Sequence, residues 1–313
     1  MMWSDSLEGA EITVPGSIAN LGPGLDTLAV AVQLYLRVRI VGVSNSRRGT
    51  LEFHFESQAP TGENRIETAF RKLAENLGEN TADCPSLQIS VSSEVPMGAG
   101  LGSSAAATIA GFRLYEVLFG KQSDERLLTV ALQLEGHADN AAAALLGGLS
   151  VCCQKGDGTV SAFSLPWPES LSLVVLTPEI RLATQTSRHA LPESVSLRDA
   201  VSNMQRALLL LQSIQTGDDG VLAEALCDRL HQPARESLVP GLNAALKLSH
   251  PDLLGVFLGG SGPSIVALAR EGCHSIAALL AESYRPLGIP FHTSILRVHN
   301  QVSLPACAAI SCS

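Results

Sequence analysis

A glycine-rich segment near the middle of the chain has the residue types that bind phosphate groups. It runs from Pro96 to Ala107 and reads Pro-Met-Gly-Ala-Gly-Leu-Gly-Ser-Ser-Ala-Ala-Ala, between a strand-like stretch and an alanine-rich helical stretch. Its glycines permit backbone angles and close approaches that a side chain would block. Ser103 and Ser104 stand at the expected helix start, where unpaired N–H groups and the positive end of the dipole attract anions. The segment therefore predicts a phosphate site whose serine hydroxyls can also reach a Mg²⁺ ion.

Fragments of this segment have other interpretations. A Gly-x-Gly pattern alone can be a plain turn between a strand and a helix. The segment is not a Walker loop, because the Gly-Lys pair of this chain, Gly120-Lys121, lies elsewhere and is followed by Gln122. It is also not a strict dinucleotide fingerprint, because Ser103 stands where the third glycine would fall. The complete twelve-residue string is more specific than any of these fragments.

The overall composition is that of a globular protein with an acidic balance. The 313 residues are 46% hydrophobic and 16% charged, and 30 acidic against 21 basic side chains give a formal net charge of −9. Because the chain has no dense run of Lys and Arg, we expect no broad binding to nucleic acid or to an anionic membrane. Seven cysteines without a Cys-x-x-Cys pair predict reduced thiols rather than disulfides or a zinc site.

The ends of the chain and its apolar runs predict a cytoplasmic protein. Residues 1–10 are polar and acidic and lack the basic and apolar regions of a signal peptide. The most apolar run, residues 141–153, is too short and too glycine-rich to span a bilayer. We expect residues 303–313 to be loosely held.

Interleaved strands and helices must position the glycine-rich segment. The predicted strands are residues 12–14, 34–43, 51–55, 87–91, 149–153, 160–165, 171–176, 255–258, 264–268 and 291–298. The predicted helices are residues 63–77, 103–119, 123–135, 139–146, 197–214, 219–230 and 275–283. The order lacks a strict strand–helix alternation, which favours an α+β fold over a doubly wound sheet. The segment Pro166-Trp-Pro168 looks like a connection, so we expect two domains, residues 1–165 and 166–313.

Three motifs in one order resemble those of the GHMP kinases, the family of galactokinase, homoserine kinase and mevalonate kinase. The glycine-rich segment is the second, preceded by Val14-Pro-Gly-Ser-Ile-Ala-Asn-Leu-Gly-Pro-Gly-Leu-Asp26 and followed by Gly255-Val-Phe-Leu-Gly-Gly-Ser-Gly-Pro-Ser264. The resemblance implies an N-terminal ATP-binding domain like domain 2 of ribosomal protein S5, a C-terminal ferredoxin-like domain, and an active site between them. It also implies ATP and Mg²⁺ as cofactors.

Within this family the motifs look like those of the homoserine kinases. The resemblance rests on four features: the Ala-Asn-Leu-Gly-Pro-Gly-x-Asp form of the first motif, the segments Glu135–Asn140 and His231–Arg235, and the spacing Thr184-x-x-x-Arg188. The motifs span residues 14–264 and so cover most of the chain. This resemblance implies ATP-dependent phosphorylation of the side-chain hydroxyl of L-homoserine to O-phospho-L-homoserine, in threonine biosynthesis.

The resemblance assigns roles to matching positions at the nucleotide end. Backbone amides of the glycine-rich segment would wrap the triphosphate. Glu135 and one of Ser103 and Ser104 would contact Mg²⁺, which prefers oxygen ligands and bridges the β- and γ-phosphates. Taken alone, Glu135 would be a solvated carboxylate at a helix end. The implied nucleotide-binding residues are Pro96, Met97, Gly98, Ala99, Gly100, Leu101, Gly102, Ser103, Ser104, Ala105 and Ala106.

At the substrate end, the resemblance assigns polar and charged residues to an amino acid. Asn20 and Asp26 match positions near the ammonium group of the substrate. Arg188 and Arg235 match two arginines that bind its carboxylate, for which planar bidentate contacts are suited. Taken alone, each arginine would be expected in a surface ion pair. The further substrate-side positions are His137, Thr184 and Gly260.

Asn140 matches the position nearest the acceptor hydroxyl. Mevalonate kinase and galactokinase resemble each other in placing an aspartate there as a base, whereas an amide takes no proton at neutral pH. The adjacent Asp139 is expected to point about 100° away around the helix. We therefore expect in-line transfer without a dedicated protein base, with Asn140, Glu135 and Ser103 as the catalytic residues. Positioning and charge neutralisation would supply most of the rate.

Three alternatives remain open at this point. Another GHMP kinase, acting on a different alcohol, would share the nucleotide loop and differ at Arg188, Arg235 and Asn140. A non-catalytic nucleotide-binding protein on the same fold would be expected to lose Glu135 or the serines, which this chain keeps. A purely structural α+β protein would leave the ordered motifs unexplained. The resemblance also suggests a homodimer.

Overall fold

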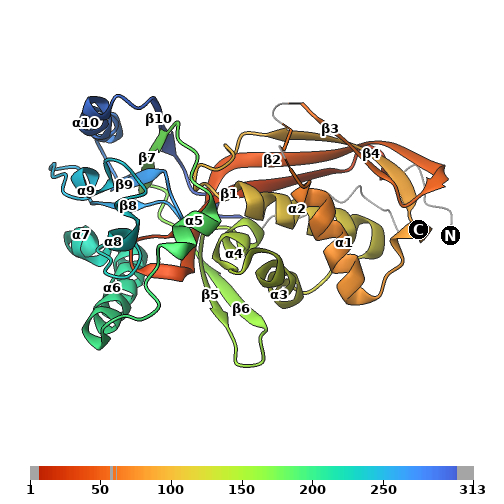
Figure 1. The fold of residues 1–313 in the computed structure, drawn as a ribbon, viewed down its shortest axis with the longest axis horizontal. Coiled ribbons are helices and arrows are strands. Elements are labelled where there is room, and N and C mark those ends of the chain that lie inside the picture. The colour runs from red at the N-terminus through yellow and green to blue at the C-terminus, as the bar shows by residue number, and fades with distance from the viewer. Residues whose placement is uncertain (1–6, 57–58, 61, 302–313) are drawn as a thin grey trace.

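The chain forms two β-sheets with helices packed against them (Figure 1). The structure is a computed structural model that describes residues 7–56, 59–60 and 62–301. The C-terminal residues 303–313, predicted to be loosely held, lie outside this described part.

The larger sheet has six strands and is organised around one long strand. Its members are β1 (Glu11–Asn20), β2 (Gly24–Arg48), β3 (Leu51–Phe55), β4 (Pro85–Ser93), β5 (Leu149–Gln154) and β6 (Val160–Leu165). Their order is β3-β4-β2-β5-β6, and β1 also pairs with β2. Because β2 is 25 residues long, it pairs with β4 toward its C-terminal end and with β5 near its N-terminal end. The sequence predicted only the middle of β2, since its ends are polar or rich in alanine.

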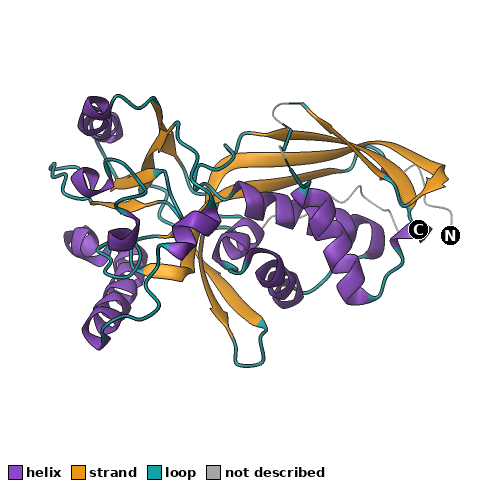
Figure 2. Cartoon of the chain, in the orientation of Figure 1, coloured by secondary structure: helices purple, strands orange, loops and turns teal. Residues whose placement is uncertain are grey.

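Four helices cover one face of this sheet (Figure 2). They are α1 (Arg65–Leu77), α2 (Ser103–Phe119), α3 (Asp124–Glu135) and α4 (Asp139–Leu146), and they confirm four of the predicted helices. The side chains of Asn64 and Ser123 accept hydrogen bonds from the first turns of α1 and α3. Gly78 and Gly136 end the same two helices with left-handed backbone angles, directly after the predicted last residues 77 and 135.

The smaller sheet is antiparallel and has helices on both faces. It contains β7 (Ser172–Pro178), β8 (Gly255–Leu258), β9 (Ile265–Ala269) and β10 (Phe291–Leu296), in the order β10-β7-β9-β8. Along β7, Leu173 and Val175 face α6 (Leu197–Thr216) and α7 (Leu222–Ala225). The alternate residues Val174 and Leu176 face α10 (Cys273–Tyr284). Both faces of β7 are thus buried, which explains its unbroken apolar sequence.

The two sheets share an apolar core. Ile18, Leu28 and Leu101 from the first half of the chain pack in one cluster with Leu226 and Phe257 from the second half. Near the C-terminal end of the described chain, Val298 also forms a bridge with Val32 of β2. The predicted division between residues 165 and 166 falls between β6 and β7 and stays a prediction.

The predicted helix 219–230 is wrong over most of its length. The chain makes a 3-10 turn at Asp219–Val221 and the single-turn α7, and then runs irregularly. The Asp228 carboxylate accepts the backbone N–H groups of residues 230, 231 and 232 at 2.7 to 3.1 Å. Such side-chain bonds replace the helical ones, which is why aspartate competes with a helix at this position. The short helices α5 (Thr184–His189), α8 (Gln232–Arg235) and α9 (Leu242–Ala245) were not predicted.

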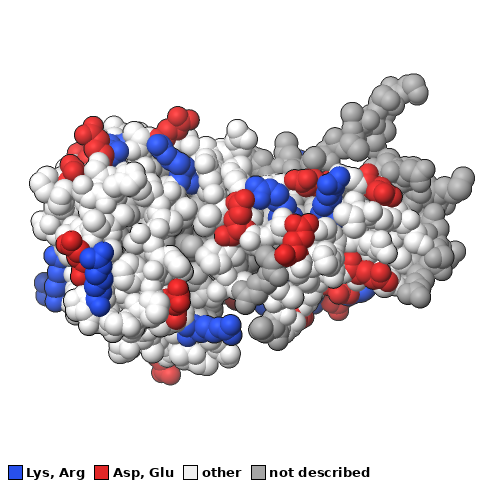
Figure 3. Space-filling view, turned by 90° about the horizontal axis from the view of Figure 1, so that it is seen from above, with Lys and Arg blue, Asp and Glu red and all other residues white. Residues whose placement is uncertain are grey.

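The surface of the described chain carries charges of both signs. On the face shown in Figure 3, acidic and basic side chains are interspersed among uncharged residues. Within the described ranges, no helix has the length and apolar character needed to cross a membrane. The described cysteines, at positions 84, 152, 153, 227 and 273, are all free thiols.

Candidate active site

The glycine-rich segment forms a loop between β4 and α2, and its glycines are needed for its shape. Gly98, Gly100 and Gly102 all have positive φ, between 71° and 76°. A Cβ on Gly100 would lie 2.6 Å from the carbonyl oxygen of Gly259, and a Cβ on Gly102 only 2.1 Å from Ser17 Oγ. The loop therefore lies against two other segments of the chain, which leave no room for side chains.

The first turn of α2 faces the cavity with its N–H groups. Gly102 is the residue before the helix, and no side chain caps the helix there. The free N–H groups of a 17-residue helix and its dipole favour a bound anion. The loop and the helix start thus have a geometry that suits a phosphate group, and the phosphate site itself stays a prediction.

A second glycine loop closes over the first one. It contains Gly259–Gly262, between β8 and β9. The Gly260 amide donates to the Ala19 carbonyl at 3.0 Å, and Ser264 Oγ donates to the Ala99 carbonyl at 2.6 Å. The Asn20 side chain also donates to the Gly260 carbonyl at 2.9 Å. All three sequence motifs thus meet at one place, although they are 70 or more residues apart in the chain.

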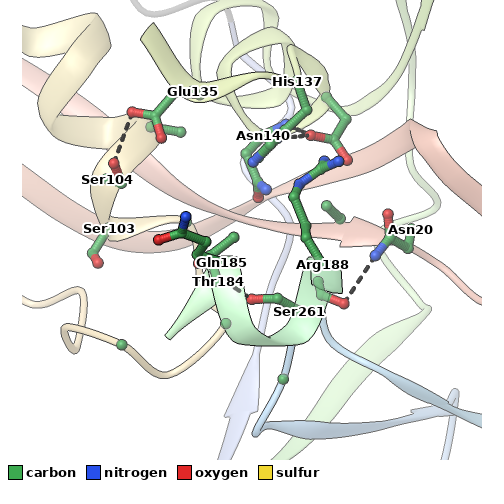
Figure 4. A pocket seen from close by; sticks show the side chains of 18 of the residues that line it. Asn20, Ser103, Ser104, Glu135, His137, Asn140, Thr184, Gln185, Arg188 and Ser261 are labelled. Atoms are coloured by element: carbon green, nitrogen blue, oxygen red, sulfur yellow. Dashed lines mark hydrogen bonds and ion pairs between the residues drawn. The ribbon is translucent and has the colours of Figure 1, made fainter. Parts of the chain in front are cut away.

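A carboxylate stands beside the helix start, at the end of α3. Ser104 Oγ donates to Glu135 Oε1 at 2.7 Å (Figure 4). Thr108 Oγ1 donates to the same atom at 2.9 Å, and Arg65 Nε lies 3.6 Å from it. Among the described residues, no cluster of three or more His, Cys, Asp or Glu side chains could hold a metal. One carboxylate and serine hydroxyls suit Mg²⁺, which keeps several waters and takes other oxygens from substrate phosphates.

Asp26 and Arg188 form an ion pair across the cavity. Arg188 Nη2 lies 2.6 Å from Asp26 Oδ1, and Nη1 lies 3.2 Å from Oδ2. Asp26 is on β2 and Arg188 is on α5, so the contact joins the two halves of the chain. This pairing was not predicted, because the sequence assigned the two residues to opposite charges of a ligand.

Arg235 is buried and held by neutral groups. It donates to the carbonyls of Ser187 and Gly260, each at 3.2 Å, and to His231 Nδ1 at 3.1 Å. Since Nδ1 accepts, the His231 proton is on Nε2, which donates to the Gly22 carbonyl at 2.7 Å. Burial lowers the pKa of His231, so its ring stays neutral beside the guanidinium. Arg235 therefore presents its charge to the cavity without a carboxylate partner among these contacts.

His137, Asp139 and Asn140 surround the start of α4. His137 Nδ1 and Asp139 Oδ1 are 2.7 Å apart, and Asp139 Oδ1 also accepts the Asn140 N–H at 2.8 Å. Burial opposes a charge on His137, but the bond to Asp139 and its negative charge outweigh burial and raise the pKa of His137. Ser17 Oγ donates to Asn140 Oδ1 at 2.9 Å, which leaves the amide nitrogen of Asn140 free of that contact.

These groups line one cavity of about 550 Å³. Most of the predicted residues line it: Asn20, Asp26, Gly98, Gly100, Gly102, Ser103, Ser104, Ala105, Glu135, His137, Asn140, Thr184, Arg188, Arg235 and Gly260. Figure 4 shows Ser103, Ser104 and Glu135 on one side and Asn140, Arg188 and Asn20 on the other. Ala99, Leu101 and Ala106 are instead buried in the core.

A second, more apolar cavity of about 490 Å³ adjoins the first. Pro96 and Met97 line it, together with Phe55 and Ile66, and both cavities share Arg65, Ser103 and Ser104. Beyond residues of the glycine-rich segment, the sequence did not single out the lining of this second cavity, because it comes from β2, β3, β4 and α1 and forms no motif.

Sequence reasoning also missed four polar residues at the first cavity or directly behind it. Ser17 lies within the first motif but carries no charge, and Asp139 was expected to point away from the Asn140 side chain. Gln185 and Ser261 line the cavity from α5 and the second glycine loop. The hydrogen bond of Ser17 to Asn140, which joins residues 123 positions apart, could not be read from local spacing.

Two family models match the chain, and curated relatives match most of it. The GHMP kinases N terminal domain matches residues 64–148, and the GHMP kinases C terminal domain matches residues 210–279. The homoserine kinase of Solibacter usitatus is 37% identical over 280 residues, which cover 88% of this chain and 90% of that protein. The homoserine kinase of Aquifex aeolicus is 31% identical over 294 residues, or 93% of this chain and 97% of that protein.

Solved structures agree with this assignment. A crystal structure of homoserine kinase from Cytophaga hutchinsonii has a TM-score of 0.80 and 25% identity, covering 96% of this chain and 98% of that one. Lactococcus lactis galactokinase, complexed with galactose, has a TM-score of 0.69 at 13% identity over 96% and 97% of the two chains, and shares the fold. The predicted two-domain α+β fold is confirmed, and the chain belongs to the GHMP kinases, within them to the homoserine kinase family.

Proposed function

We propose that this chain transfers the γ-phosphoryl group of ATP to the side-chain hydroxyl of L-homoserine, giving O-phospho-L-homoserine and ADP. The observation that carries the proposal is one cavity that joins a glycine-rich helix start to a charged end containing Asp26, Arg188 and Arg235. The first end suits a phosphate chain, and the second suits a group that carries both a positive and a negative charge. The names of the curated relatives support the same acceptor.

The nucleotide fits the two adjoining cavities. Its phosphates would lie on the N–H groups of the loop and of the first turn of α2. Its base would enter the apolar cavity between Phe55, Ile66 and Met97, which adjoins the helix start at Ser103 and Ser104. This arrangement extends the predicted nucleotide site beyond the loop, because it gives the base a place that the motif alone did not indicate.

Mg²⁺ would be held by Glu135 together with the hydroxyl of Ser103 or Ser104. When bound, the ion neutralises charge on the phosphates. Oε1 of Glu135 already accepts hydrogen bonds from two hydroxyl groups, so the carboxylate is held in position before any ligand binds. Fixed groups lose little energy in reorganisation during the reaction.

The acceptor would be oriented by groups on five elements, β1, β2, α4, α5 and α8. Asp26 and Asn20 would take its ammonium group, and Arg188 and Arg235 its carboxylate, with Thr184, His137 and Gly260 around them. Asn140 would then lie beside the hydroxyl. In the structure Asn140 Oδ1 accepts from Ser17, so its amide nitrogen is available to donate to the oxygen of the hydroxyl.

No protein base is needed in this proposal. Asp139 is the nearest candidate, but it is buried, and its Oδ1 is occupied by His137 and by the Asn140 N–H. We infer that Asp139 positions His137 and Asn140, and that the proton of the hydroxyl passes to an oxygen of the transferred phosphoryl group. An Asp139→Asn variant that binds both substrates normally but loses all turnover would overturn this inference.

The direct test is an acceptor panel. ADP release should require Mg²⁺ and should be at least about 100-fold more efficient with L-homoserine than with L-serine, mevalonate or galactose, since unpaired buried charges strongly disfavour a poor fit. Preference for a sugar or for mevalonate would show that the chain is another GHMP kinase. Nucleotide binding without transfer to any acceptor would indicate a non-catalytic role.

We further propose that the chain forms a homodimer through α6. This helix exposes Leu197, Met204 and Leu208, with 81%, 59% and 64% of each residue accessible, and Val201 lies between them. These four residues are spaced four, three and four positions apart, so they lie along one face of the helix and form an apolar seam. Antiparallel copies would place Leu197 of one opposite Leu208 of the other.

Light scattering should show a dimer that Leu208→Glu dissociates. Leu287→Glu changes another exposed apolar position and should leave the dimer intact.

We also propose that the protein acts in the cytoplasm. Cys153 and Cys227 are exposed free thiols, which persist in a reducing compartment. Fractionation of cells that produce the protein, with detection by antibody, would test this.

A further inference from the structure

The charged end of the cavity contains an ion pair that is complete without a ligand. The Arg188 guanidinium makes a bidentate contact with the Asp26 carboxylate, with N–O distances of 2.6 and 3.2 Å. The Asp26 side chain is 41% exposed and that of Arg188 is 31% exposed. An ion pair with this much exposure is weak, so a ligand that offers better partners can separate it.

The backbone around Asp26 is held in place independently of the pair. Asp26 has a φ of 54°, a left-handed angle uncommon for a residue with a side chain. Its N–H donates to Asn20 Oδ1 at 3.2 Å, and its carbonyl accepts from Cys152 Sγ at 3.6 Å. Burial raises the pKa of Cys152 to about 12, so this thiol stays protonated and can donate. The carboxylate would therefore stay directed at the cavity if Arg188 moved away.

The backbone of Arg188 is held in place as well. On α5, Ser187 Oγ donates to the Ser261 carbonyl at 2.7 Å, and the Ser187 carbonyl accepts from Arg235 at 3.2 Å. These contacts attach α5 to the second glycine loop and to α8. The Arg188 side chain is long and flexible, so it can turn to a new partner while the helix stays in place.

We infer that the Asp26–Arg188 ion pair occupies the place of a zwitterion, and that the substrate binds by separating it. The inference rests on the proposed function. The ammonium group of the amino acid would replace Arg188 on Asp26, and its carboxylate would replace Asp26 on Arg188. Two opposite charges leave each other and two opposite charges enter, so the net charge of the cavity does not change.

This exchange makes the two charges of the substrate act together in selection. A ligand with only a carboxylate can meet Arg235, but to reach Arg188 as well it must take this arginine from Asp26 and leave the Asp26 carboxylate unpaired. A ligand with only an ammonium group leaves the guanidinium unpaired in the same way. Either ligand gains one contact and loses one, so the closed pair rejects both.

Removing one member of the pair should therefore improve the binding of the opposite half-substrate. In Asp26→Asn, Arg188 is free for the carboxylate of 4-hydroxybutanoate, which is homoserine without its ammonium group. In Arg188→Gln, Asp26 is free for 3-amino-1-propanol, which is homoserine without its carboxylate. Simple loss of a contact would predict no gain for either compound.

The experiment is calorimetric titration of these ligands and of L-homoserine into the wild type and both variants, with a non-hydrolysable ATP analogue and Mg²⁺ present. We expect Asp26→Asn to bind 4-hydroxybutanoate about three- to five-fold more tightly than the wild type, as suits a weak pair. Arg188→Gln should bind 3-amino-1-propanol more tightly by a similar factor. L-homoserine should bind at least about ten-fold more weakly to both variants.

The chain offers a matched control. Asp219 and Arg270 form another bidentate pair, with exposed fractions of 29% and 24%, outside the cavity. Asp219→Asn makes the same chemical change and should leave every affinity unchanged. Asparagine tolerates the left-handed angle of residue 26, so Asp26→Asn should fold, and Arg188→Gln on α5 gives an independent second measurement.

The outcomes separate the two proposals. If the wild type phosphorylates L-homoserine but neither half-substrate gains affinity in its variant, the exchange is wrong and the proposed function stands. If L-homoserine binds and the half-substrates gain affinity, but no phosphate is transferred, the exchange stands and the proposed function is wrong. If L-homoserine does not bind the wild type at all, both are wrong.

Discussion

The two ends of the cavity are built in different ways. The phosphate end is one continuous stretch of backbone, residues 96–104, whose shape depends on glycines and on the second glycine loop. The acceptor end is assembled from single side chains on β1, β2, α4, α5 and α8. The first end depends mainly on space and backbone conformation, and the second mainly on charge.

This difference suggests how the enzyme could change its acceptor while keeping its nucleotide. Residues of the acceptor end are separate side chains, so one substitution alters one contact. In the phosphate loop, a Cβ on Gly100 would lie 2.6 and 2.8 Å from the carbonyl oxygens of Gly259 and Gly262, so a side chain there would disturb both loops. We expect substitutions at the phosphate end to reduce all activity, and those at the acceptor end to change specificity.

The strongest test of this comparison is Gly100→Ala. Its Cβ would lie 2.6 Å from the Gly259 carbonyl oxygen, so the two glycine loops must separate. We expect kcat/KM to fall by more than about 100-fold, because a displacement of about 1 Å can have that effect on an aligned reaction. Steady-state assays with ATP and L-homoserine would measure it.

Gly98→Ala is the matched control for this change. Gly98 has nearly the same φ, 71° against 76°, but nothing lies within 4 Å of its Cβ position. The substitution should add only the strain of an alanine at a left-handed angle, which costs about 1–2 kcal/mol of folding free energy. Equal losses of kcat/KM in the two variants would mean that the backbone angle, and not the contact between the loops, determines the shape of the phosphate end.

Glu135→Gln tests whether a fixed negative charge is needed at the phosphate end. We expect kcat to fall about 100-fold, the usual scale for one preorganised electrostatic group, with a higher requirement for Mg²⁺. The control is Glu125→Gln, because Glu125 lies on the same helix in an exposed pair with Lys155. This variant should keep the kcat of the wild type. A normal kcat for Glu135→Gln at saturating Mg²⁺ would exclude Glu135 as a metal ligand.

Arg235→Gln tests the acceptor end. Its guanidinium would serve the carboxylate of the substrate, so KM for L-homoserine should rise by about 30-fold, or roughly 2 kcal/mol. KM for ATP should change by less than about two-fold, since the Asn20 amide still holds the Gly260 carbonyl of the second glycine loop when the Arg235 contact is lost. A parallel rise in both KM values would show that the two ends are not separable.

Much of the fold and of the phosphate end could be predicted from the sequence, because both depend on local patterns. Helix caps such as Asn64 and Gly78 mark element boundaries within a few residues. The glycine-rich loop is contiguous, so its motif and its structure are the same segment. The α+β class likewise follows from the order of the elements.

The rest depends on contacts between distant residues. The helix predicted over 219–230 fails because Asp228 bonds to neighbouring backbone N–H groups and because Asn203 donates to it from α6. Ser17 and the apolar cavity beside Met97 acquire a role only when separate strands and helices meet. The same holds for the Asp26–Arg188 pair, whose members are 162 positions apart.

The smallest predicted effect concerns protonation near the acceptor end. Asp139 raises the pKa of His137 above its ordinary value, despite burial, so the folded state holds this proton more tightly than the unfolded chain does. The stabilisation is fully present below the unfolded pKa, about 6.5, and is lost as the pH rises through the folded value. His137→Gln should therefore lower Tm most in acid and least in alkali.

Thermal unfolding of the wild type and of His137→Gln between pH 5 and 9 would measure this. We expect a pH-dependent part of about 2 °C or less, the scale for under 1 kcal/mol in a chain of this size. Asp139→Asn removes the carboxylate that raises the pKa of His137 and leaves burial, which lowers it, so adding His137→Gln to this variant should lower Tm no more in acid than in alkali. A difference that grew toward alkaline pH would mean that the folded protein binds this proton more weakly. In that case the His137 ring would be neutral at the acceptor end, and only the arginines would supply positive charge there.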